Sequence, residues 1–132
     1  MGKQIFVNLA VKDLKKAIDF YTKLGFTFNP KFTNDDATCM IINENAFAML
    51  LVEPFFKSFM KKDIADTKKS NECILAYSVD SKKEVDEFAD KAMKAGATKS
   101  NDPSDQGFMY SRSFQDLDGH LWEVFYMDPA AA

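Results

Sequence analysis

The strongest constraint on the fold of this chain is a pattern that its two halves share. In each half an extended apolar run precedes an amphipathic helix with a capping residue, a glycine that ends the helix, and further apolar runs. The matched positions are Val11 and Val79, Asp13 and Ser81, Gly25 and Gly96, and the runs 46–52 and 120–126. We therefore predict a duplicated strand–helix–strand–strand–strand unit. The alternative is an unduplicated α+β chain that contains two similar helices.

The first half is followed by a segment of different character. Apolar residues recur at three- and four-residue steps over 14–24, which predicts a helix between Asp13 and Gly25. The expected strands of this half are 4–11, 26–29, 38–42 and 46–52. Residues 54–72 are amphipathic at first and then charged. Their cluster of Phe55, Phe56, Phe59 and Met60 predicts a docked connector helix, with a lid as the alternative.

The second half repeats these signals. Ser81 and Glu84 have the spacing of a capping box, and they precede an apolar stripe of helical period. The expected strands are 73–79, 109–115 and 121–127, and the Asp-Leu-Asp-Gly sequence at 116–119 predicts a hairpin turn between the last two. We expect a single domain that consists of a first module (1–53), a connector (54–71) and a second module (72–132).

Composition excludes several classes of protein. The chain has 17 Lys and Arg against 20 Asp and Glu, a net charge of −3, whereas a nucleic-acid binder is normally basic. We therefore expect no nucleic-acid partner. No run approaches 18 consecutive apolar residues, so we also expect no membrane span. Its one histidine, His120, excludes a metal site built from two or three histidines of one chain.

The two cysteines bear on the cellular compartment. Cys39 and Cys73 both stand in apolar runs, and a disulfide framework needs more cysteines than two. We predict free, buried thiols in a reducing compartment. The first residues also lack the apolar core of a signal peptide, so we expect a cytoplasmic protein.

Four short motifs resemble those of a known superfamily. They are Asn-Leu-Ala-Val-Lys-Asp-Leu at 8–14, Phe-Tyr and Leu-Gly-Phe within 20–26, and Asp-Leu-Asp-Gly-His-Leu-Trp-Glu-Val at 116–124. In this order and frame the chain resembles the vicinal oxygen chelate superfamily, which includes glyoxalase I, bleomycin resistance protein and extradiol dioxygenases. The resemblance implies an α+β fold in which two βαβββ modules form a mixed-sheet cup around a ligand, often in a homodimer.

The resemblance also implies four positions at which metal-using relatives hold a divalent ion. Carried onto this chain, they are Phe6 and Ile74 in the first strand of each module, and Met49 and Glu123 in the last. Phe and Ile offer no lone pair, and a Met thioether suits Cu(I) rather than Zn²⁺, Ni²⁺ or Mn²⁺. One carboxylate cannot hold a divalent ion against water. We therefore expect no metal site and no cofactor.

Strand periodicity identifies what the cup would contain, because residues two apart share a face. The face of the four positions is apolar with a few polar groups, as is usual for small-molecule sites. Asn8 either bonds a ligand or caps a neighbouring polar group, and Tyr110 either stacks on a ligand or belongs to the core. The candidate ligand-binding residues are Phe6, Asn8, Met49, Leu51, Ile74, Tyr110, Arg112, Glu123 and Phe125.

Glu123 is the best catalytic candidate, although no catalytic residue is assigned. A lone carboxylate in an apolar cup is costly, so it should be paired or protonated. If Gln115 faces His120 across the hairpin, Arg112 lies opposite Glu123. We predict an Arg112–Glu123 pair, which is either a structural ion pair or a device that orients a ligand or makes Glu123 a base.

Two functions remain open from sequence. The first is metal-independent binding of a small, partly apolar molecule in a homodimer, as in the drug-sequestering branch of the superfamily. The alternative is an enzyme of glyoxalase type, a lyase, isomerase or dioxygenase relative, with an unusual metal arrangement or none. The missing ligands favour the first.

Overall fold

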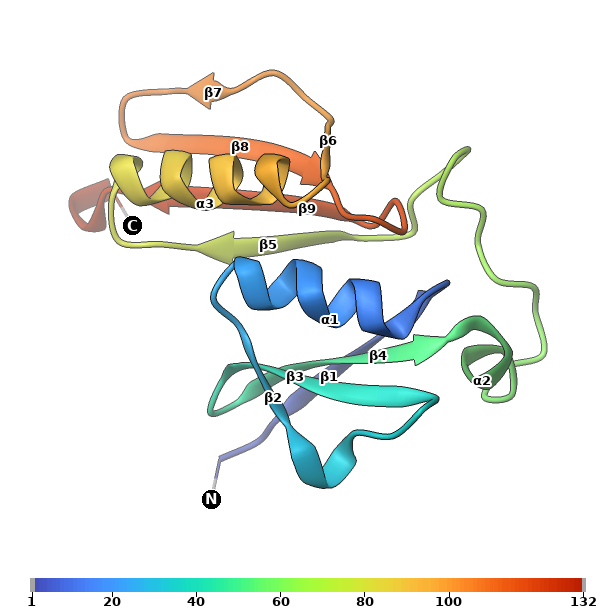
Figure 1. Cartoon of the computed structure of the whole chain (residues 1–132). Helices are drawn as coiled ribbons and strands as arrows, with labels where there is room; N and C mark the ends of the chain where they lie inside the picture. The colour runs from blue at the N-terminus through green and yellow to red at the C-terminus, as the bar shows by residue number, and fades with distance from the viewer. Residues whose placement is uncertain (1, 132) are drawn as a thin grey trace. The chain divides into compact units, whose positions relative to one another are not determined.

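The computed structural model describes residues 2–131, and the chain divides into two compact units, Met1–Ala65 and Asp66–Ala132 (Figure 1). Each unit combines one mixed sheet with one long helix. The predicted α+β class is confirmed, and both units follow the strand–helix–strands order of the duplication. No helix within residues 2–131 combines the length and apolar character needed to cross a bilayer.

The first unit has the sheet order β1-β4-β3-β2, in which β1 and β4 are parallel and the other pairs antiparallel. Asp13 caps α1 because its Oδ1 accepts a hydrogen bond from the Lys16 N–H at 3.1 Å. The elements are β1 (Ile5–Val11), α1 (Leu14–Lys23), β2 (Thr27–Asn29), η1 (Pro30–Phe32), β3 (Ala37–Asn43), β4 (Ala46–Val52) and α2 (Glu53–Lys57). The predicted connector helix thus corresponds to the short α2, which contacts β1 and β4.

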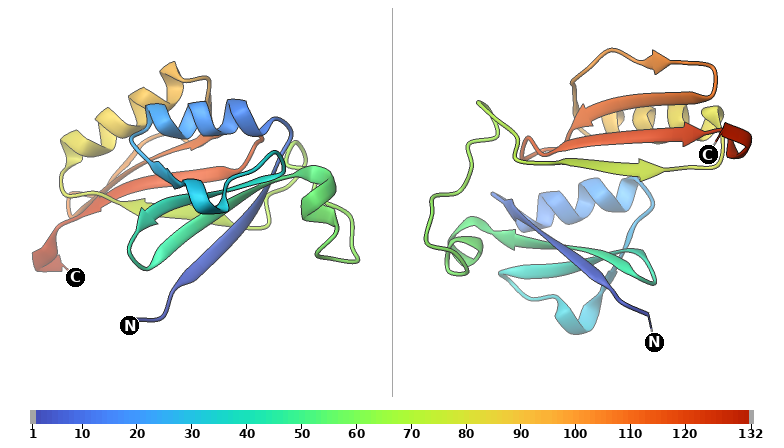
Figure 2. Two further views of the ribbon diagram at one scale, coloured as in Figure 1. Left: turned by 60° about the horizontal axis from the view of Figure 1, so that its bottom comes forward. Right: turned by 180° about the vertical axis from the view of Figure 1, so that it is seen from behind.

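The second unit has the sheet order β5-β9-β8-β6, with the short β7 also paired to β8. One face of β8 and β9 is covered by α3, as the rear view shows (Figure 2). The Ser81 Oγ accepts from the Glu84 N–H at 3.1 Å, and the Glu84 carboxylate accepts from the Asp80 N–H at 3.1 Å. The elements are β5 (Ile74–Ser78), α3 (Lys82–Lys94), β6 (Thr98–Lys99), β7 (Ser104–Asp105), β8 (Met109–Gln115), β9 (Leu121–Met127) and η2 (Pro129–Ala131).

The strand registers repeat between the units. Asn8 of β1 lies beside Met49 of β4, and Ala76 of β5 lies beside Glu123 of β9, each in a parallel pair. These are the positions that the sequence overlay equates. The duplication therefore extends to the pairing of individual residues, and it fixes which side chains share a face.

Each sheet buries the face that its helix covers. In the first unit Leu9, Met40 and Leu50 are at most 3% exposed, and in the second Phe114 and Val124 are fully buried. Further core residues are Ala17, Phe20, Tyr21, Val85, Ala92 and Trp122. The helices thus leave the opposite sheet faces to carry the candidate site.

One of the two cysteine predictions is wrong. Cys39 is buried in β3, and burial raises the pKa of its thiol. Cys73 is exposed because it stands just before β5, which is the edge strand of its sheet. Both thiols are free.

Candidate functional site

In the first unit, the candidate residues lie on the sheet face opposite the core residues Leu9 and Leu50. Phe6 is 48% exposed and stacks on Phe47, with ring centroids 4.8 Å apart. The exposed Asn8 donates its side-chain amide to the Phe6 carbonyl at 3.4 Å. Met49 is half-buried beside Asn8, whereas Leu51 is only 2% exposed and offers a ligand little surface.

In the second unit, Glu123 lies near the centre of the open sheet face. It pairs with Ala76 on one side and Ser113 on the other. Glu123 and Phe125 are half-buried, whereas Ile74 on the edge strand β5 is 57% exposed. This face therefore presents one carboxylate among aliphatic and aromatic side chains.

The predicted Arg112–Glu123 pair is wrong, because the hairpin register differs from the predicted one by one residue. Gln115 pairs with Leu121 rather than with His120, so Arg112 stands opposite Val124 and Ser113 stands opposite Glu123. A slip of one residue moves a strand's side chains to the other face. Arg112 therefore lies on the face that α3 covers.

Arg112 is held by two acids of α3. Its Nη1 donates to Asp86 Oδ1 at 3.1 Å and to Asp90 Oδ1 at 3.0 Å, and the Tyr110 hydroxyl donates to Asp86 at 2.7 Å. Burial would lower the pKa of the Arg112 guanidinium, but the hydrogen bonds to Asp90 and Asp86 outweigh it and raise that pKa. The hydrogen bond to Asp86 raises the pKa of the Tyr110 phenol.

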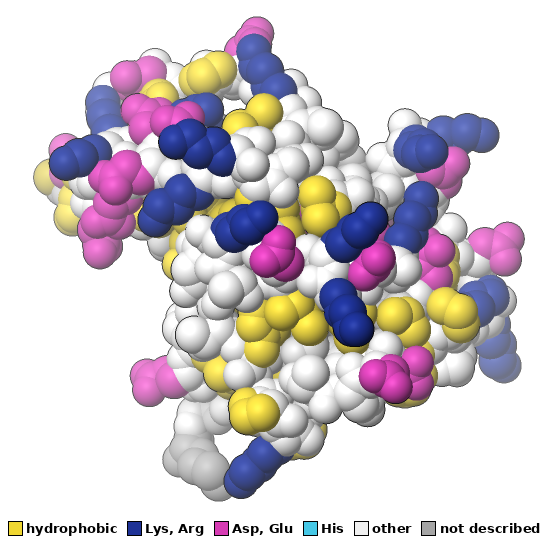
Figure 3. Space-filling model, in the orientation of Figure 1, with side chains coloured by type: hydrophobic (Ala, Val, Ile, Leu, Met, Phe, Trp, Pro, Cys, Tyr) yellow, Lys and Arg dark blue, Asp and Glu magenta, His cyan; other side chains and the backbone are white. Residues whose placement is uncertain are grey.

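The placement of Tyr110 and Arg112 in the cup is therefore wrong, since both side chains join β8 to α3. Acidic and basic side chains lie next to one another on this part of the surface (Figure 3). The sequence held a signal for this network. Asp86 and Asp90 stand four residues apart in the predicted helix, so they share one helix face.

Glu123 is left without a partner by this arrangement. Among residues 2–131, its carboxylate makes no hydrogen bond and no ion pair, whereas every ion pair of Arg112 involves the helix α3. A half-buried carboxylate gains from a hydrogen-bond donor or a positive charge. The side chain is therefore free to contact a bound molecule.

The four positions of the metal-using relatives do not fit a divalent ion in either unit. The first unit contributes Phe6 and Met49, and the second contributes Ile74 and Glu123. However these positions are combined, they supply one carboxylate, and divalent ions need several oxygen or nitrogen ligands. Within residues 2–131 no group of three or more His, Cys, Asp or Glu side chains is arranged to hold a metal.

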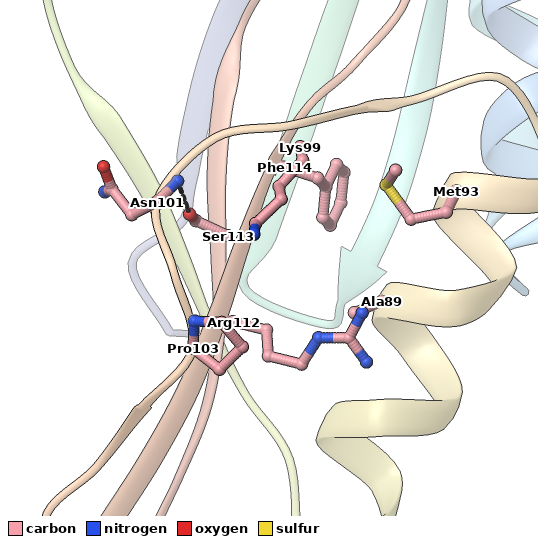
Figure 4. A pocket seen from close by; sticks show the side chains of 8 residues that line it. All are labelled: Ala89, Met93, Lys99, Asn101, Pro103, Arg112, Ser113 and Phe114. Atoms are coloured by element: carbon pink, nitrogen blue, oxygen red, sulfur yellow. Dashed lines mark hydrogen bonds between the residues drawn. The ribbon is translucent and has the colours of Figure 1, made fainter.

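A cavity in the second unit was missed by sequence reasoning. Its volume is about 230 Å³, and it lies between α3, β8 and the segment that follows β6 (Figure 4). Asn101 attaches that segment to β8, because its backbone N–H donates a hydrogen bond to the Ser113 Oγ at 2.8 Å. No sequence motif marks such a cavity, since it depends on how a loop crosses the edge of β8.

Comparisons with known proteins agree with the geometry. A family model described as Glyoxalase/Bleomycin resistance protein/Dioxygenase superfamily matches residues 3–124. A hypothetical protein from S. aureus is similar in structure, with a TM-score of 0.80 and 26% identity over 96% of this chain and 95% of that one. A comparison with curated proteins finds no match.

Two more distant structures share the fold alone. A glyoxalase/bleomycin resistance protein/dioxygenase family enzyme from Burkholderia phytofirmans has a TM-score of 0.78 and 16% identity, over 96% of this chain and 99% of that one. A fosfomycin resistance protein from Listeria monocytogenes has a TM-score of 0.68 and 20% identity, over 96% and 91%.

Proposed function

Because this chain belongs to the glyoxalase/bleomycin resistance protein/dioxygenase superfamily, we propose that it binds a small, partly apolar molecule without a divalent metal ion. The observation that carries the proposal is the unpartnered carboxylate of Glu123 on the open face of its sheet. A metal-using relative would need further ligands beside it. Here Ile74, Phe125 and Leu121 share that face and suit an apolar surface instead.

The chemistry of this face indicates which ligand group Glu123 receives. A carboxylate accepts hydrogen bonds only, so its partner is an N–H or O–H donor or a positive charge. The apolar neighbours contribute burial at roughly 25 cal/mol per Å² of covered area. We infer a ligand with an apolar or aromatic body and a donor group, for example an amine or an amide.

The experiment is a thermal-shift screen of metal-stripped protein in the presence of EDTA. The panel contains aromatic antibiotics that carry amino groups and, as a contrasting class, S-conjugates of glutathione. A compound that binds the native state raises the unfolding temperature in a saturable manner. The proposal predicts stabilisation by a member of the first class, unchanged when Zn²⁺, Ni²⁺ or Mn²⁺ replaces the EDTA.

A pair of matched variants locates the site. Glu123→Gln removes the charge of the candidate residue, and Glu87→Gln removes the same charge from an exposed position of α3. We expect the first variant to weaken binding about tenfold, as for a lost charge-assisted hydrogen bond, and the second to leave it unchanged. Stabilisation that occurs only with added metal contradicts the proposal and supports the alternative of a metal-using enzyme of glyoxalase type.

We further propose that the protein is a homodimer. Both sheets end in an edge strand, β1 and β5, and Ile5 and Ile74 on these strands are 62% and 57% exposed. Exposed edge strands with apolar side chains favour association. Light scattering after gel filtration should give twice the mass of 15.0 kDa, and a monomer at micromolar concentration contradicts this part of the proposal.

The two free thiols suit the reducing cytoplasm, where we place the protein.

A further inference from the structure

The cavity of the second unit has one charged wall and one apolar wall. Lys99 of β6 and Arg112 of β8 supply the charged wall, and Figure 4 shows the Arg112 guanidinium extending toward Ala89 of α3. Met93 and Phe114 form the apolar wall, with the Met93 thioether directed toward the Phe114 ring (Figure 4). An amphiphilic cavity of this kind suits a molecule with one polar end.

The charged side chains that line the cavity are both cations, and the carboxylates paired with them lie outside the lining. Of the described residues on its walls, two are cations and none is an acid. Asp86 and Asp90 both bond to Nη1 of Arg112 and lie outside the lining. They hold the guanidinium in place, while its Nε and Nη2 donate to no described residue. A guanidinium positioned in this way suits a carboxylate.

Lys99 is available to join Arg112. Lys99 Nζ lies 2.9 Å from Oδ1 of Asp102, three residues along the chain, and the two side chains are 62% and 89% exposed. Such an exposed pair contributes little and exchanges readily for another anion. The lysine can therefore turn to a bound anion at small cost.

The size and the apolar wall limit the rest of the ligand. An engineered apolar cavity of about 150 Å³ holds benzene, so 230 Å³ accommodates one ring and a carboxylate. Pockets for drug-sized molecules start at about 300 Å³. Met93 is 39% exposed, and its flexible thioether can adapt to a flat ring.

We propose that this cavity is a second binding site, for a small aromatic or short-chain carboxylate whose charged group lies between Lys99 and Arg112. Lys99, Arg112 and Phe114 place the site on the face of β8 that α3 covers, at the edge of the sheet where Ser113 also lines the cavity. The two cations therefore stand on the face opposite Glu123, and the site does not depend on the function proposed above.

The test is a titration of ¹⁵N-labelled protein with benzoate, benzamide and benzylamine at constant ionic strength. We expect saturable shifts with benzoate, centred on the amides of Lys99, Asn101 and Ser113. Benzamide has the same shape without the charge and should bind about tenfold more weakly, and benzylamine has the wrong charge and should not bind there.

Matched variants make the result specific. Lys99→Gln should weaken benzoate about tenfold, whereas Lys94→Gln, an exposed lysine of α3 outside the lining, should leave its affinity unchanged. The proposal is overturned if benzoate causes no saturable shifts, if benzamide binds equally well, or if the two lysine variants behave alike.

Discussion

Replacing Gly119 by alanine tests the turn that sets the register of Glu123. Gly119 ends the Asp116–Gly119 turn between β8 and β9, and its φ is +83°, a region that alanine adopts at a cost of roughly 1–2 kcal/mol. A methyl group there would also overlap the Thr67 side chain, since its carbon would lie 2.8 Å from Thr67 Cβ. Thr67 would have to move, and its hydroxyl would lose the 2.6 Å hydrogen bond to the Asp118 carbonyl.

The magnitude follows from these two contributions. The hydrogen bond adds about 0.5–1.5 kcal/mol to the backbone strain, so we expect Gly119→Ala to lower the free energy of unfolding by about 1.5–3.5 kcal/mol. Gly107→Ala is the matched control in the same unit. Gly107 has the same φ of +83° but nothing within 4 Å of an added Cβ, so only the strain of roughly 1–2 kcal/mol remains.

Urea unfolding followed by tryptophan fluorescence measures both variants. The only tryptophan is Trp122 of β9, so its emission reports on the unit that contains both glycines. The free energies come from the transition midpoints and slopes. Equal destabilisation by the two variants, or a larger effect at Gly107, would refute the role assigned to Thr67.

Three other predictions concern the contacts between α3 and β8. In urea titrations, Arg112→Ala should lower the free energy of unfolding by about 1 kcal/mol, because it removes the ion pairs with Asp86 and Asp90. Glu123→Gln removes no ion pair and should change the free energy of unfolding by less than about 0.5 kcal/mol. Phe114→Ala should cost about 3–5 kcal/mol in the same assay, since Phe114 is fully buried. The raised pKa of Tyr110 means that its contribution to stability is present below about pH 10 and is lost as pH rises through that pKa. In a pH titration monitored at 295 nm, Asp86→Asn should bring the pKa of Tyr110 back toward its ordinary value, and an unchanged titration would contradict the hydrogen bond as its cause.

Much of the fold could be predicted from the sequence, because local signals agreed with the global pattern. The strands 46–52, 109–115 and 121–127 have the predicted bounds, and Asp13 and Ser81 cap their helices as expected. Periodicity also identified the buried face of each sheet. The short strands β6 and β7 were not assigned, since two residues carry no periodicity.

The candidate site could be predicted only in part, because it depends on strand register. The Asp116 N–H donates to the His120 carbonyl, so the connection is one residue longer on the β9 side than the predicted turn. Because of this one-residue shift, the side chains of Arg112 and Tyr110 lie on the sheet face that α3 covers, and Glu123 lacks its expected partner. Turn geometry sets the register, and residue types alone did not define this turn.

The metal content of the purified protein is the most direct test of the proposal that this protein works without a divalent metal ion. Protein purified without chelator should contain far less than one equivalent of Ni, Zn, Mn or Fe by mass spectrometry, because only Glu123 of the four carried-over positions can bind such an ion. One equivalent of any of these metals in the native protein, lost in Glu123→Gln but retained in Glu87→Gln, would contradict the account.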